Sequence, residues 1–210
     1  MTIVQAIESV ANWLNADVCK EIRLKLPDEY QEGKSYKVEE VSPTAFAMFQ
    51  PTKEKLPPSV RAPFPSVVVQ LLEGADNLTS STGRMKLQLS FTAWNPGEHS
   101  GEFKVSEQQL TAEEGVELGL KLKPAEGSQG FERSTEGWKD VWNFTDATLR
   151  KIENAEYIEG LRVVKELGIT FGQFNVEGQI SDLYPYWGSW VIFTIERGLA
   201  RTGAAYSEFL

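Results

Sequence analysis

The sequence predicts an α+β (mixed α/β) domain, in which one mostly antiparallel sheet packs against two main helices and an insertion protrudes. Apolar residues recur every three or four positions near the N-terminus and again after residue 136, the spacing of amphipathic helices. Elsewhere they alternate at every second position, which is typical of strands. With 210 residues, 41% of them hydrophobic, the chain can bury one full core, so we expect a single domain over residues 1–210.

The first helix is expected over residues 3–14, where the apolar side chains form one stripe. Thr2 and Gln5 have the spacing of a capping box, which places the start of the helix. Asn15 and Asp17 are expected to end it, because both residues favour helix boundaries over helix interiors.

Strands follow. Residues 22–26 alternate apolar and charged side chains and predict a half-buried strand, and residues 28–62 predict one or two short strands joined by a proline-rich loop. Residues 66–73 are almost continuously apolar, so this strand is expected to be central and buried on both faces. A polar loop over 74–84 then leads to a strand over 85–94, and the two strands are expected to form a hairpin.

The helical period returns after residue 136. Trp138 leads this segment and Trp142 lies on its apolar stripe, so we expect an aromatic stripe that packs against the sheet. Residues 161–175 predict one or two further strands, and residues 187–197 predict the last strand, which is apolar on both faces.

Residues 95–136 differ from the rest of the chain. They contain six glycines and nine acidic against four basic residues, so we interpret them as an insertion or protruding loop with little apolar surface to bury. An alternation over 116–122 allows a short outlying strand there. We expect residues 98–135 to lie outside the core and residues 198–210 to form a C-terminal arm.

Composition excludes several classes of protein. The formal net charge of −9 argues against a broad nucleic-acid-binding face. The single cysteine, Cys19, excludes an intrachain disulfide and a cysteine zinc site, and we expect it to fill the core. No apolar run has the length of a membrane span. Glu8 and the missing basic leader argue against a secretion signal.

Motifs for catalysis are sparse. The one histidine, His99, lies in a polar stretch where we expect it to be solvent-exposed. Asp28 and the pair Glu32 and Lys34 superficially resemble a nuclease site, but the spacing leaves no room for a strand between them. The phosphate-binding glycine motifs are missing. We therefore expect no enzyme activity, no cofactor and no metal, and a metal-dependent nuclease that uses Asp28 and Glu32 remains an alternative.

Four large aromatic residues lie within seven positions before the last strand: Tyr184, Tyr186, Trp187 and Trp190. Trp187 and Trp190 should face opposite sides of that strand, because they are three residues apart. We expect Trp190 to lie in the core, and Tyr184, Tyr186 and Trp187 to lie at a subunit interface, where aromatic residues are enriched. A second alternative is a ligand-binding module with an aromatic platform at Trp187 and Trp190.

The order of these pieces also carries a resemblance. The N-terminal helix and strand are followed by the runs Phe64–Leu71, Gly74–Asn77, Phe91–Trp94, Gly137–Asn143 and Tyr184–Trp190. In this order the chain resembles, over residues 2–94 and 136–197, the tail-terminator (tail-completion) proteins of long-tailed bacteriophages and prophages. These motifs are structural and not catalytic.

The resemblance implies a mixed α/β structural protein that assembles as a homo-oligomeric, usually hexameric, ring at the head-proximal end of the tail tube. Such a ring ends tail polymerisation and supports head–tail joining during virion assembly. It implies as partners other copies of the chain, the tail tube protein and the head–tail connector or neck protein. It also implies a place in the neck of the virion tail, and in the host cytoplasm during assembly. A ring through which DNA passes should not bind phosphate tightly, and an acidic chain fits that requirement.

Overall fold

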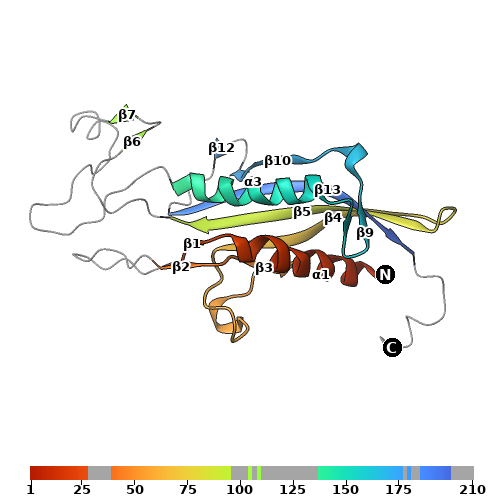
Figure 1. The fold of residues 1–210 in the computed structure, drawn as a ribbon, viewed down its shortest axis with the longest axis horizontal. Coiled ribbons are helices and arrows are strands. Elements are labelled where there is room, and N and C mark those ends of the chain that lie inside the picture. The colour runs from red at the N-terminus through yellow and green to blue at the C-terminus, as the bar shows by residue number, and fades with distance from the viewer. Residues whose placement is uncertain are drawn as a thin grey trace, which may run out of the picture.

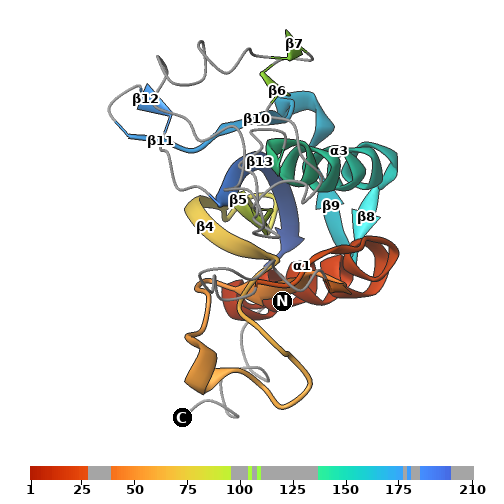
Figure 2. The ribbon, with the colours of Figure 1, turned by 90° about the vertical axis from the view of Figure 1, so that its left-hand side faces the viewer.

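The computed structural model describes residues 1–27, 39–95, 137–176, 179–180 and 185–199, together with the backbone of two short strands at 104–105 and 108–109. A curled, mostly antiparallel sheet carries two helices (Figure 1). Figure 2, turned by 90°, shows both helices on the same side of the long strands. The predicted α+β fold is confirmed.

The main sheet has the strand order β3-β4-β5-β13-β9-β8, and β10 also pairs with β13. Its strands are β3 (Thr44–Ala47), β4 (Ser66–Asn77), β5 (Thr82–Trp94), β8 (Tyr157–Ile158), β9 (Leu161–Val163), β10 (Thr170–Gln173) and β13 (Tyr186–Gly198). Only β3 and β4 are parallel in this sheet. The short strands form separate pairs: β1 (Leu24–Lys25) with β2 (Glu40–Val41), β6 (Lys104–Val105) with β7 (Gln108–Gln109), and β11 (Asn175–Val176) with β12 (Gln179–Ile180).

Helix α1 (Ile3–Trp13) begins as predicted. The Thr2 hydroxyl accepts from the Gln5 backbone N–H, and the Gln5 side chain accepts from the Thr2 backbone N–H. The α-helix ends at Trp13, within one residue of the predicted bound. Asn15 and Asp17 do not stop the winding as expected, because the chain continues through a π-helical turn, Leu14–Val18, and a 3₁₀ turn, Cys19–Glu21. Leu14, Val18 and Cys19 are buried in the core, which keeps the chain wound past the polar residues.

Asn15 lies in the π-helical turn after α1 and connects it to the sheet. Its side chain forms two hydrogen bonds to the backbone of Ala45 in β3, accepting from the N–H at 2.8 Å and donating to the carbonyl oxygen at 3.1 Å. Strand β3 lies at one end of the sheet order. The asparagine therefore occupies backbone groups that would otherwise be open to pairing with another strand.

The hairpin of β4 and β5 is confirmed, but its loop is shorter than predicted. Residues 74–77 and 82–84 belong to the strands, and only residues 78–81 form the turn. Glycine and polar residues disfavour strands on average, yet here they are held by pairing with β5, after a bulge between Leu71 and Glu73. The prediction that β4 is buried on both faces holds for Ser66–Val69 and fails beyond, where the strand becomes exposed.

The core lies between the two helices and one face of the sheet. Strand β5 contributes the predicted alternating set, and β13 contributes the same face from Val191 onward. Helix α3 (Trp138–Asn154) buries Phe144 more deeply than the predicted Trp142, and Trp138 is exposed. The buried residues on these elements are Met85, Leu87, Leu89, Phe91, Val191, Phe193, Ile195, Val141, Phe144, Thr145, Thr148, Leu149 and Ile152.

The two strands predicted over residues 161–175 are confirmed as β9 and β10. The strand predicted over 22–26 is much shorter, because only Leu24–Lys25 pair, with β2. The described part of the chain has no helix that is both long and apolar enough to cross a membrane. Most of the predicted insertion 95–136, including 116–122, and the arm beyond residue 199 lie outside the described residues.

Candidate assembly site

The predicted interface residues lie where β13 begins. Tyr186, the first residue of β13, is half-buried, and its ring packs against Phe64 with the centroids 5.0 Å apart and the planes tilted by 54°. Burial raises the pKa of the Tyr186 hydroxyl above its ordinary value. Tyr184 lies outside the described residues. The Phe64–Tyr186 pair joins the segment before β4 to the start of β13.

Trp187 points to the opposite side of β13 from Tyr186, toward the core. It is half-buried, packs against the core cluster, and donates its indole N–H to the backbone carbonyl oxygen of Asn95 at 2.9 Å. Gly137 lies so close that an added Cβ would be 2.4 Å from the indole nitrogen. The start of α3 therefore requires glycine where it meets this ring.

Trp190 lies on the other face and is half-buried, outside the core cluster. Its ring covers Gly172 of β10, where an added Cβ would be 2.6 Å away, and its indole N–H donates to the carbonyl oxygen of Gln173 at 3.1 Å. The expectation that Trp190 fills the core while Trp187 points away is therefore wrong, although the two do face opposite sides. The alternation of side chains along β13 determines which tryptophan faces the core. Trp187 lies on the same face as the buried Val191, and Trp190 lies on the opposite face.

Asn95 connects four elements at this end of the sheet. Its side-chain oxygen accepts from the Lys25 ammonium at 2.9 Å, and its side-chain nitrogen donates to the Asp140 carboxylate at 2.7 Å. Its backbone N–H donates to the carbonyl oxygen of Pro185 at 2.9 Å. Together with the Trp187 bond, these contacts hold the ends of β1, β5, α3 and β13 together. We call Lys25, Asn95, Asp140 and Trp187 the Asn95 cluster.

Burial raises the pKa of the Asp140 carboxyl, while the hydrogen bond from Asn95 and the charge of Lys25 act in the opposite direction. The sequence does not predict this cluster, because the pattern around Asn95 indicates only the start of an insertion. The one sequence signal is an asparagine, with its donor and acceptor groups, directly after a buried strand.

A pocket of about 210 Å³ lies beside Phe64. Its apolar walls are Leu26, Val41, Val60, Ala62, Phe64 and Pro65, and its polar lining is Ser42, Thr44, Ser59 and Arg61. We call it the Phe64 pocket. Because Phe64 also packs on Tyr186, the pocket adjoins a residue that the sequence predicted to lie at an interface.

A larger pocket, of about 590 Å³, lies beside the turn of the β4–β5 hairpin. Arg84 and Arg162 line it, and both form ion pairs with Glu196, at 3.2 and 3.5 Å. Arg162 also pairs with Glu166. Since these arginines are already matched by carboxylates, the charges do not indicate an anion site.

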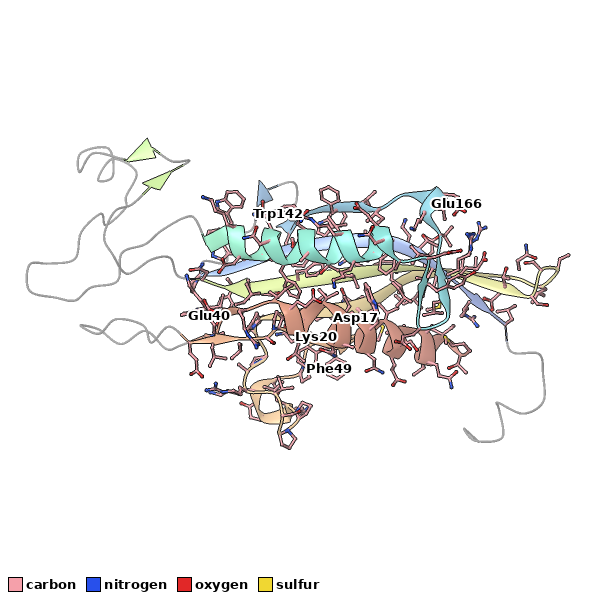
Figure 3. All side chains as sticks on the ribbon, viewed as in Figure 1. Asp17, Lys20, Glu40, Phe49, Trp142 and Glu166 are labelled. Atoms are coloured by element: carbon pink, nitrogen blue, oxygen red, sulfur yellow. The ribbon has the colours of Figure 1, made fainter. Side chains whose placement is uncertain are left out.

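Large apolar side chains are exposed on separate sides of the body. Phe49, 68% exposed, follows β3, and Phe171, 54% exposed, lies on β10 with its ring edge-on to Trp142 at 6.3 Å. Figure 3 shows Phe49 below α1 and Trp142 above, on α3. Contiguous exposed apolar surface marks protein–protein contacts, and Phe171 and Trp142 form a contiguous pair of this kind.

The remaining candidates are the residues considered for catalysis or metal binding. Cys19 is buried as predicted, and burial raises its pKa to about 12. Asp28, Glu32 and His99 lie outside the described residues. Across the ranges that the structure describes, no group of three or more histidine, cysteine or acidic side chains could hold a metal ion.

Comparison of the chain with family models, with curated proteins and with solved structures finds no match.

Proposed function

We propose that this protein is a non-enzymatic phage structural protein. It forms a homo-oligomeric ring, hexameric by resemblance, at the head-proximal end of the tail tube. There it ends tail polymerisation and supports head–tail joining. The order of sequence motifs over residues 2–94 and 136–197 suggests this assignment.

The observation that carries the proposal is the distribution of exposed apolar side chains. A ring subunit contacts two neighbouring copies through two different patches, and in a tail it also contacts the tube and the connector. Such a subunit needs several separate contact surfaces. Phe49, Phe171 and Leu78 are exposed at three separate places of one body, after β3, on β10 and at the β4–β5 turn.

The aromatic-platform alternative has less support. Trp187 and Trp190 face opposite sides of β13, and each indole N–H already donates to a backbone carbonyl oxygen. Two rings on opposite faces of a sheet do not stack on one ligand.

The experiment that tests the proposal is a mass measurement in solution, with electron microscopy of the purified full chain. We expect particles of several copies of the 23.5 kDa chain arranged as closed rings. A chain that stays monomeric at every concentration would contradict the proposal. Metal-dependent DNA cleavage that Asp28→Ala abolishes would instead support the nuclease alternative.

A further inference from the structure

The turn of the β4–β5 hairpin presents an apolar side chain on a fixed loop. Leu78 is 83% exposed. The Asn77 side-chain oxygen accepts from the backbone N–H groups of Thr79 and Ser80, at 3.0 and 3.2 Å, and the hydroxyls of Ser80 and Thr82 are 2.8 Å apart. These bonds hold the turn in one shape. A leucine held in this way loses little conformational freedom when it enters a partner.

The Phe64 pocket is equally well fixed. Phe64 packs on Tyr186, and the backbone N–H of Leu26 donates to the carbonyl oxygen of Glu39 at 2.7 Å. The N–H of Val60 donates to the carbonyl oxygen of Pro57 at 2.9 Å. With about 210 Å³ and six apolar residues in its lining, the pocket suits one aliphatic side chain.

The charges around the two features are opposite. The hairpin arm, residues 72–81, contains Glu73 and Asp76 and no basic residue. The proline-rich loop beside the pocket, residues 48–65, contains Lys53, Lys55 and Arg61 against Glu54. Arg61 pairs with Glu39, so the positive charge offered to a partner comes from Lys53 and Lys55. Asp76 remains 46% exposed although it pairs with Arg197. Complementary charges of this kind favour and orient association.

The two features cannot meet within one chain. They lie at opposite ends of the long axis in Figure 1, with the hairpin at the right and β1 and β2 at the left. Strand β5 runs between them over Thr82–Trp94, a distance of roughly 40 Å at the usual rise per residue. A contact between them therefore joins two copies.

We propose that Leu78 of one copy seats in the Phe64 pocket of the next copy, so that each subunit gives its hairpin to one neighbour and its pocket to the other. The inference rests on the proposed function. Because Leu78 and the Phe64 pocket lie at different places on the same subunit, their contact is head-to-tail, and such contacts close into a ring when the rotation between copies permits.

The first test compares solution mass for Leu78→Asp and for Leu167→Asp, a matched control. Leu167 is 58% exposed on the 3₁₀ turn Lys165–Leu167, outside the β4–β5 turn and outside the lining of the Phe64 pocket. We expect Leu78→Asp to weaken assembly at least about tenfold, because the leucine that enters the pocket becomes a carboxylate. At low protein concentration, where assembly does not contribute, its thermal midpoint should equal that of the wild type. Leu167→Asp should keep the wild-type mass.

The second test traps the contact as a disulfide. Leu78→Cys and Ser59→Cys variants, the latter in the pocket lining, are mixed under oxidising conditions. Cys19 stays out of the reaction because it is buried with its pKa raised to about 12. We expect a linked dimer from the mixture and much less from either variant alone.

The outcomes separate the two proposals. Rings that survive Leu78→Asp and give no cross-link would overturn this contact and leave the proposed function standing. A wild-type chain that is monomeric throughout would overturn both.

Discussion

Replacing Trp187 tests whether its indole side chain stabilises the fold. Trp187→Ala removes a half-buried indole that packs on the core and donates to the carbonyl oxygen of the buried Asn95. A fully buried large aromatic costs about 3–5 kcal/mol on truncation, and half burial reduces that to roughly 2. The lost hydrogen bond adds about 1 kcal/mol. We therefore expect the free energy of unfolding to fall by about 3 kcal/mol.

The assay is chemical denaturation together with a thermal scan at low protein concentration, where assembly does not contribute. For a chain of this length, a change of about 3 kcal/mol lowers the thermal midpoint by roughly 6–12 °C. Trp187→Phe keeps most of the packing and should lose only about 1 kcal/mol. The exposed aromatic control, Phe171→Ala, should cost no more than about 1 kcal/mol. A Trp187→Ala variant as stable as the wild type, with its assembly lost, would refute the structural role and favour an interface role alone.

Three further predictions concern single contacts. Asn15→Ala should lower the free energy of unfolding by about 1–2 kcal/mol in denaturant, because it removes both hydrogen bonds to the backbone of Ala45. Amide hydrogen exchange at Ala45 should also become faster. Unchanged exchange at Ala45 would contradict the contact. Gly137→Ala should lower the thermal midpoint by the equivalent of about 1–3 kcal/mol, since its Cβ would overlap the Trp187 indole. The raised pKa of Asp140 means that the folded state binds the carboxyl proton of Asp140 more tightly than the unfolded state does. The contribution of Asp140 to the free energy of unfolding is therefore greatest below its ordinary pKa of 3.8. It falls as pH rises through the raised pKa of the folded state. The stability of wild type relative to Asp140→Asn should therefore decrease with pH over that window, and a flat or rising difference would contradict it.

Local patterns in the sequence were sufficient for most of the elements. The capping box of Thr2 and Gln5, the alternation of β5 and the stripe of α3 each appear within one or two turns or strand repeats. Each depends on burying one face of a single element, and the period of that face is visible in the chain itself. The fold class follows from their order along the sequence.

Contacts between distant segments were decided only by the tertiary structure. Strand β4 extends into 74–77 because β5 pairs with it. The chain stays wound past Asn15, in the π-helical turn after α1, where the Asn15 side chain bonds to Ala45, thirty residues away. The alternation of β13 predicted that Trp187 and Trp190 face opposite sides, but not which side holds the core. That choice depends on the helices that cover one face and on β10, which brings Gly172 beneath Trp190 on the other. An alternating strand that is apolar on both faces carries the same local pattern in either orientation, so only the elements packed against it distinguish the two.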